Sequence, residues 1–186
     1  MNVNLAVKIA SRSLLLIGDK PLSNFNEESD KANIVNLLYE TTLLSLISSY
    51  PWNFCTSKRE LNKETATPII DWQYQYKLPT DFVILKSCTA GLNYEIISDD
   101  LLLCDHPSLY ITYIRRPDES YFQPWFTECF EYLLASKISV LVTEKAQVGE
   151  LMFGIYQKLY SQAISTDGKQ VPNPSMAHRP LVNCVG

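Results

Sequence analysis

The sequence around His106 contains several residues of the types that bind metal ions. Cys88, Cys104 and His106, with Asp105 beside them, carry the thiolate, imidazole and carboxylate groups that suit zinc. Structural zinc sites pair their ligands across short spacings, and only one short pair occurs here, Cys104 with His106. We therefore favour isolated, buried cysteines over a metal site.

A nucleophilic Cys–His pair is a second candidate, formed by His106 with Cys104 or Cys129. Cys129 falls in an expected helix beside an aromatic residue, which favours core packing. His106 precedes Pro107 at an expected turn, which favours a solvated loop residue. The only other histidine is His178, and the chain contains no GxGxxG, GxxxxGK[ST], HExxH or GxSxG pattern.

Neighbouring charged residues offer a third kind of chemistry. Carboxylate pairs occur at Glu27-Glu28, Asp99-Asp100 and Asp118-Glu119, and a hydrolase could use two carboxylates about 5 to 9 Å apart. The dipole of a following helix explains the first pair better, and turns explain the other two. The basic pairs Lys58-Arg59 and Arg115-Arg116 could contact phosphate, but a solvated strand face explains them better.

Composition excludes several classes of protein. The chain has 186 residues, of which 46% are hydrophobic and 19% charged, as expected for one globular domain. Its net charge of -4 does not suit binding to nucleic acid by neutralising phosphates. No apolar run approaches the roughly 20 residues that span a bilayer. The first residues lack a signal-peptide layout, and the five cysteines include no CxxC, so we expect reduced thiols in the cytosol.

Two helices are predicted at the start of the chain. Helical periodicity runs from Val3 to Ile17 and ends at Gly18; a second helix should start from an N-cap at Asn26 and stop at Pro51. One apolar stripe of the second helix comprises Ala32, Val35, Tyr39, Leu43, Leu46 and Tyr50, and further apolar residues lie off it at Ile34, Leu37, Leu38, Leu44 and Ile47. A surface helix is normally apolar on one side. This helix therefore needs additional cover, from its own domain or from a neighbouring subunit.

The remaining segments complete an α+β fold. Strands are predicted at 72–78, 82–88, 94–97, 101–104 and 109–113, and helical periodicity returns from Pro124 to Val142 and from Leu151 to Ala163, closing at Asp167-Gly168. We therefore predict a mainly helical bundle (1–53 and 117–168) with an inserted small antiparallel β domain (54–116). Residues 169–186 are expected to form an extended C-terminal arm that orders on a partner; a frayed terminus is the alternative.

Several segments, taken in order, resemble the head-to-tail adaptor family of short-tailed bacteriophages, also called tail tubular protein A or tail accessory factor. The resemblance extends from about Leu14 to Gln170. The matching pieces are Leu15-Leu16-Ile17-Gly18, Ser23-Asn24-Phe25-Asn26-Glu27, Tyr50-Pro51-Trp52-Asn53-Phe54-Cys55, Tyr74-Gln75-Tyr76-Lys77-Leu78-Pro79-Thr80-Asp81, Tyr110-Ile111-Thr112-Tyr113, Phe122-Gln123-Pro124-Trp125-Phe126 and Asp167-Gly168. The C-terminal segment departs from the family pattern, because it lacks a basic and aromatic ending.

The resemblance implies a structural virion protein without catalytic activity or cofactor. Such a protein would form a dodecameric ring beneath the portal, receive the tail nozzle, and extend the channel through which double-stranded DNA passes without specific binding. It would assemble in the host cytoplasm, reside in the virion tail and bind no membrane. An acidic lumen would suit passage of DNA. The residues expected to bind the portal are Val171, Pro172, Met176, His178, Arg179 and Leu181.

Five residues are expected at the joint between helices and sheet: Pro51, Trp52, Phe54, Leu78 and Pro79. Two alternatives to the adaptor function stay open. One is a cell-wall hydrolase of a phage tail, using carboxylates such as Glu128 or Asp118. The other is a different head-completion or tail-terminator subunit.

Overall fold

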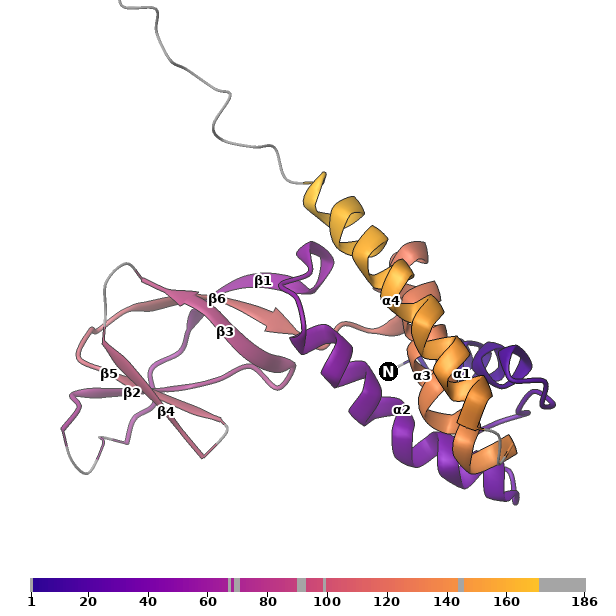
Figure 1. Cartoon of the computed structure of the whole chain (residues 1–186). Helices are drawn as coiled ribbons and strands as arrows, with labels where there is room; N and C mark the ends of the chain where they lie inside the picture. Colours follow the sequence, from indigo (N-terminus) through magenta and orange to yellow (C-terminus); the bar gives the residue numbers. More distant parts are fainter. Residues whose placement is uncertain are drawn as a thin grey trace, which may run out of the picture.

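The computed structural model describes residues 2–66, 68, 71–89, 93–98, 100–143 and 146–170. In this part of the chain, helices and strands form two separate groups (Figure 1). The helices are α1 (Val3–Leu16), α2 (Asp30–Ser48), α3 (Pro124–Thr143) and α4 (Ala146–Gly168). The strands are β1 (Thr56–Leu61), β2 (Tyr74–Lys77), β3 (Phe82–Cys88), β4 (Tyr94–Ile97), β5 (Leu101–Cys104) and β6 (Leu109–Arg115). The predicted α+β class is confirmed.

The helical group is arranged around α3, which contacts each of the other three helices. It packs closely against α4 at Gly149, where a Cβ atom would lie 2.7 Å from Ser139 Oγ and 3.2 Å from the carbonyl oxygen of Ser136. The first helix ends as predicted, because Gly18 adopts a positive φ of 83°. None of the described helices combines the length and the hydropathy needed to cross a membrane.

The start of α2 corrects the sequence prediction. The N-cap is Ser29, whose side chain accepts a hydrogen bond from the backbone N–H of Ala32, and not Asn26. The carboxylate of Glu27 accepts hydrogen bonds from the backbone of Ser23 at 3.0 Å and from Ser29 Oγ at 3.1 Å. These side chains offer the backbone an alternative to a helix, so the first turn starts later. Glu27 therefore supports a loop, and its pKa is lowered by these hydrogen bonds, with that from Ser23 first.

The six strands form two antiparallel sheets, in the orders β1-β6-β3 and β2-β5-β4. The predicted bounds of β3, β4 and β5 are confirmed. Strand β2 starts later than predicted, at Tyr74, because the backbone N–H of Gln73 donates to Asp105 Oδ1 at 2.9 Å and not to a neighbouring strand. No bounds were predicted for β1, because the charged run from Lys58 to Glu60 interrupts its alternation.

Each group of elements has its own apolar core. The larger core lies among the helices and includes Leu14, Tyr39, Trp52, Phe126 and Phe130. The smaller core lies in the β part, and its buried residues are Leu61, Tyr76, Leu78, Leu102, Cys104, Leu109, Ile111 and Tyr113. The two sets share no buried residue. The β part thus packs largely on itself and projects from the helices, as Figure 1 shows.

Candidate functional site

The joint between the two parts is built around Trp52. This side chain is fully buried, and its indole Nε1 donates to the carbonyl oxygen of Leu46 at 2.9 Å. Its ring centroid lies 4.8 Å from that of Tyr50, 5.4 Å from that of Phe126 and 5.9 Å from that of Tyr160. Such edge-on aromatic contacts add to the free energy gained by burial. Trp52 therefore connects the end of α2 with both α3 and α4.

Of the five residues predicted at this joint, the three from the Pro-Trp-Asn-Phe segment lie there. Phe54 packs against Phe126, with ring centroids 4.8 Å apart, and Pro51 directly follows the end of α2. Leu78 is buried instead in the core of the β part. Pro79 accepts a hydrogen bond from the backbone N–H of Phe82 at 3.0 Å, in the turn before β3. Leu78 and Pro79 lie away from the joint because they follow β2, which belongs to the second sheet, β2-β5-β4.

A hydrogen-bonded pair connects the joint with the end of α4. The carboxylate of Asp167 accepts from the backbone N–H of Asn53 at 3.0 and 3.1 Å, and from Asn53 Nδ2 at 2.9 Å. Asn53 Nδ2 also donates to the carbonyl oxygen of Asp167 at 2.8 Å. Burial raises the pKa of Asp167, against the lowering effect of the Asn53 backbone. Two of the segments that carry the family resemblance therefore contact each other.

Asn53 gives the first testable prediction. Replacing it with alanine removes both side-chain hydrogen bonds, so we expect the free energy of unfolding to fall by about 1–3 kcal/mol. Urea denaturation followed by circular dichroism measures the loss. The exposed Asn62 offers a matched control, because Asn62→Ala should change stability little. Equal stabilities of the two variants would contradict a role for the Asn53–Asp167 contact.

A second polar cluster, centred on Arg116, lies where the chain passes from β6 to α3. Arg116 Nε and Nη2 donate to the two carboxylate oxygens of Glu40 at 3.0 and 2.9 Å, and Nη2 also donates to Glu119 Oε1 at 2.6 Å. The second oxygen of Glu119 accepts from the backbone N–H of Asn2 at 2.7 Å. Burial alone would lower the pKa of Arg116, but the hydrogen bonds to Glu40 and Glu119 outweigh it and raise the pKa. The cluster therefore joins the start of α1, the middle of α2 and the segment before α3.

This cluster corrects the interpretation of two charged pairs. Arg116 was predicted to lie on a solvated strand face, yet its side chain is only 15% exposed, because it neutralises the buried carboxylate of Glu119. Asp118 does lie in a turn, as predicted: it caps the short helix Glu119–Tyr121 by accepting from Ser120. The predicted pair of Asp99 with Asp100 cannot be placed, since Asp99 lies outside the described residues.

In the described residues, the metal and nucleophilic candidates, which the sequence pattern disfavoured, are not brought together as sites. Within the described ranges, no group of three or more His, Cys, Asp or Glu side chains could hold a metal ion. Cys104 Sγ donates to the backbone carbonyl of His106 at 3.7 Å and not to its ring, and burial raises the pKa of this thiol. Cys129 lies in the helical core, far from His106 in the fold, and burial raises its pKa to about 12. The carboxylate of Asp105 accepts a hydrogen bond from the backbone N–H of Gln73.

A groove of about 560 Å³ between α1 and α3 brings several charged residues together. It is lined in part by Lys8, Arg12, Glu119, Glu128 and Glu131. Arg12 Nη1 lies 3.2 Å from Glu131 Oε1. Burial raises the pKa of Glu131, and Arg12 partly offsets this effect. Of the two carboxylates considered for a hydrolase, Glu128 lines this groove and Asp118 does not.

Exposed apolar side chains mark two helical surfaces. On α2, Leu37 is 76% exposed, while Ile34, Leu38 and Leu44 are half-buried. Near the turn from α3 to α4, Val140, Leu141 and Leu151 are 48%, 58% and 60% exposed. The sequence predicted that α2 needs cover on a second side; Ile47 obtains it within the chain, whereas Leu37 does not.

The residues expected to bind a portal, Val171, Pro172, Met176, His178, Arg179 and Leu181, all lie outside the described residues. Sequence reasoning missed the partnership of Asn53 with Asp167 and of Arg116 with Glu119, because no local pattern marks contacts between distant segments. Among known proteins, no family model matches the chain and no curated protein matches it.

Proposed function

We propose that the protein is a structural subunit of a phage head-to-tail connector, which binds copies of itself between a portal and a tail nozzle. The observation that carries the proposal is the second apolar stripe of α2. Leu37 lies on the opposite side of α2 from the buried stripe of Val35, Tyr39 and Leu43. Leu37, which is 76% exposed and flanked by the half-buried Ile34, Leu38 and Leu44, is the centre of the contact surface that we propose.

The second apolar surface, at Val140, Leu141 and Leu151, supports contacts in which one surface of a subunit packs against a different surface of its neighbour. It belongs to α3 and α4, whereas Leu37 lies on the solvent-facing side of α2. Two different apolar surfaces on one subunit favour heterologous association, which generates a ring when the rotation closes. The number of twelve subunits comes from the family resemblance alone.

Several side chains that were considered for catalysis have structural partners, which also favours a structural role. The carboxylate of Glu119 is paired with Arg116, and Asp118 caps a short helix. The thiols of Cys104 and Cys129 have raised pKa values, opposite to those of nucleophilic cysteines. A net charge of -4 is compatible with a channel that does not retain DNA.

Electron microscopy of the protein mixed with rings of its cognate portal tests this function. We expect an added ring on the tail side of the portal, and loss of that ring on deletion of residues 169–186. Leu37→Asp should prevent neighbouring subunits from packing, whereas Gln157→Asp, at an exposed position of α4, should leave the ring intact. Unchanged portal binding by the deletion variant would contradict the role of the arm, and absence of wild-type binding would contradict the function.

A cell-wall hydrolase is the second candidate, supported by the groove in which Glu128 and Glu131 lie three residues apart on α3. A raised pKa at Glu131 beside the exposed Glu128 is the kind of arrangement that acid–base catalysis needs. A turbidity assay on bacterial cell walls distinguishes the candidates: clearing that is lost in Glu128→Gln would favour the hydrolase.

A further inference from the structure

Three of the four sheet edges in the β part are protected against further pairing. The outer edge of β2 is covered by the preceding segment: Lys63 forms a bridge with Tyr76, and the backbone N–H of Glu64 donates to the carbonyl oxygen of Gln75 at 2.9 Å. Strand β3 carries two register irregularities. Strand β1 presents the exposed charged run from Lys58 to Glu60. Irregularities, charges and covering segments are the features by which proteins block edge pairing.

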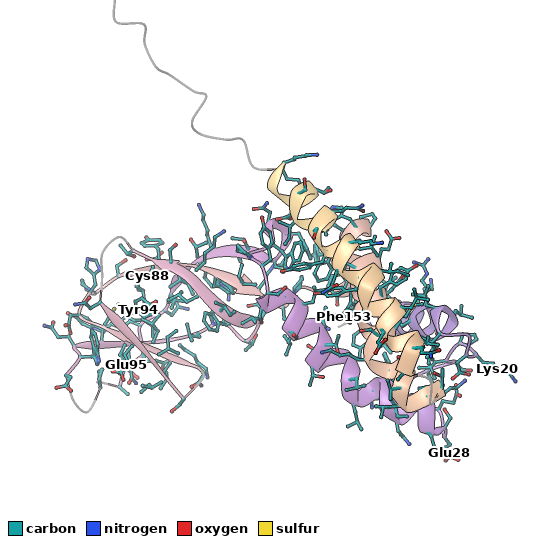
Figure 2. All side chains as sticks on the ribbon, viewed as in Figure 1. Lys20, Glu28, Cys88, Tyr94, Glu95 and Phe153 are labelled. Carbon is teal, nitrogen blue, oxygen red and sulfur yellow. The ribbon has the colours of Figure 1, made fainter. Side chains whose placement is uncertain are left out.

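Among the described residues, the fourth edge, that of β4, has no covering segment, no register irregularity and no run of charges. All four residues of β4 are exposed, and Tyr94, Ile96 and Ile97 are 45%, 37% and 36% exposed. Its one charged residue is Glu95, whose Oε2 accepts from Trp72 Nε1 at 3.0 Å. Figure 2 shows Tyr94 and Glu95 in the β part, at the end of the molecule opposite Lys20 and Glu28. Among the described strands, only β5 pairs with β4, so the other edge of its backbone has no partner in the described part of the chain.

The segment that follows α4 starts close to the residues that lead into β1. Gln170 is held by a hydrogen bond from its backbone N–H to the carbonyl oxygen of Asp167 at 3.1 Å. Asp167 in turn binds Asn53, which opens the short helix leading into β1. Ten residues, 171–180, separate this point from residues 181–185 and span about 35 Å when extended, whereas β1 is about 20 Å long. This segment can therefore reach the second sheet without crossing the helices.

The chemistry of residues 181–185 matches the open edge. In the sequence Leu181-Val182-Asn183-Cys184-Val185, four of the five residues are apolar and two are β-branched, and Pro180 before it suits the start of an edge strand. Its length is close to that of β4. Arg179, just before it, supplies a positive charge for the exposed carboxylate of Glu95. We propose that residues 181–185 add to β4 of the same chain as an extra strand, a contact that does not rest on the connector function.

Hydrogen exchange of the full-length protein tests the proposal. Alternate amides of β4 face the open edge, so we expect them to exchange at least about tenfold more slowly in the wild type than in the double variant Val182→Pro, Cys184→Pro. The proline substitutions remove backbone donors without altering the described part of the chain. Ser175→Pro is the matched control and should retain the slow exchange. Equal exchange of β4 in the wild type and the double variant overturns the proposal.

A cross-link through Cys184 supplies a second measurement, under copper-phenanthroline oxidation of the full-length chain. Ile96→Cys should form a disulfide with Cys184 within one chain, identified by peptide mass. Leu151→Cys, at an exposed position of α4, should not. A predominantly intermolecular disulfide would overturn the assignment to the same chain, and equal cross-linking at positions 96 and 151 would overturn the pairing with β4.

Discussion

Replacing Arg116 with alanine is expected to destabilise the protein by about 3–5 kcal/mol, because it leaves a buried carboxylate without its counter-charge. That carboxylate belongs to Glu119, whose side chain is fully buried and lies 2.6 Å from Arg116 Nη2. Among the described contacts of the Glu119 carboxylate, only the hydrogen bond from the backbone N–H of Asn2 would remain. Urea denaturation, followed by circular dichroism and by fluorescence, measures the change.

Two neighbours of Arg116 supply controls for this prediction. Arg115 lies 5.2 Å from the ring of Tyr121, so Arg115→Ala should cost less than about 1 kcal/mol. Glu40 also binds Arg116, but its side chain is 45% exposed, so Glu40→Ala should likewise cost less than about 1 kcal/mol. A loss in Arg116→Ala no larger than in these two variants would show that the buried carboxylate does not depend on Arg116.

Replacing Trp52 with alanine is expected to destabilise the protein by about 3–5 kcal/mol, since it opens a large cavity in the helical core. The side chain is fully buried among rings from α3 and α4, and its loss also leaves the carbonyl oxygen of Leu46 without the indole donor. The change is measured as a shift of the urea midpoint at an unchanged slope.

The matched control is Trp72→Ala, because Trp72 is half-buried and packs against the core of the β part. We expect a clearly smaller loss there, and no change in the packing of the helices. If the two tryptophan variants lost the same stability, Trp52 would not be the central residue of the joint.

The two separate cores have a consequence for assembly. The helical core includes Trp52 and Phe126, and the β part buries its own set around Tyr76 and Tyr113. Arg116 and the Asn53–Asp167 pair lie where the two parts meet, so they set how the β part is attached. In a connector, that attachment would position the β part relative to the ring of helices.

Local residue chemistry was enough to determine the class of fold and several element ends. Gly18 provides the left-handed residue after α1, and Pro124 occupies the first position of α3. Alternation of apolar and polar residues predicted β3 to β5 with their bounds, and apolar periodicity predicted the buried stripe of α2. These features depend on residues close together in the chain, which is why the sequence alone could determine them.

Competition between local alternatives was harder to predict. Both Asn26 and Ser29 can cap a helix, and the hydrogen bonds of Glu27 in the folded chain decided for Ser29. Likewise Leu78 and Pro79 follow β2 in the chain, but the pairing of β2 with β5 places Leu78 in the core of the β part and away from the joint.

The contacts between distant segments were decided by the tertiary structure alone. Asn53 and Asp167 are 114 positions apart, and Asn2 and Glu119 are 117 apart, so no periodicity or motif could pair them. The exposure of individual side chains was also decided by the tertiary structure. The sequence indicated that α2 has more apolar surface than one side can bury. The packing of α2 against α3 decided that Leu37 is the residue left in solvent. The sequence determined which residues prefer burial, and the fold determined which of them its limited interior could accept.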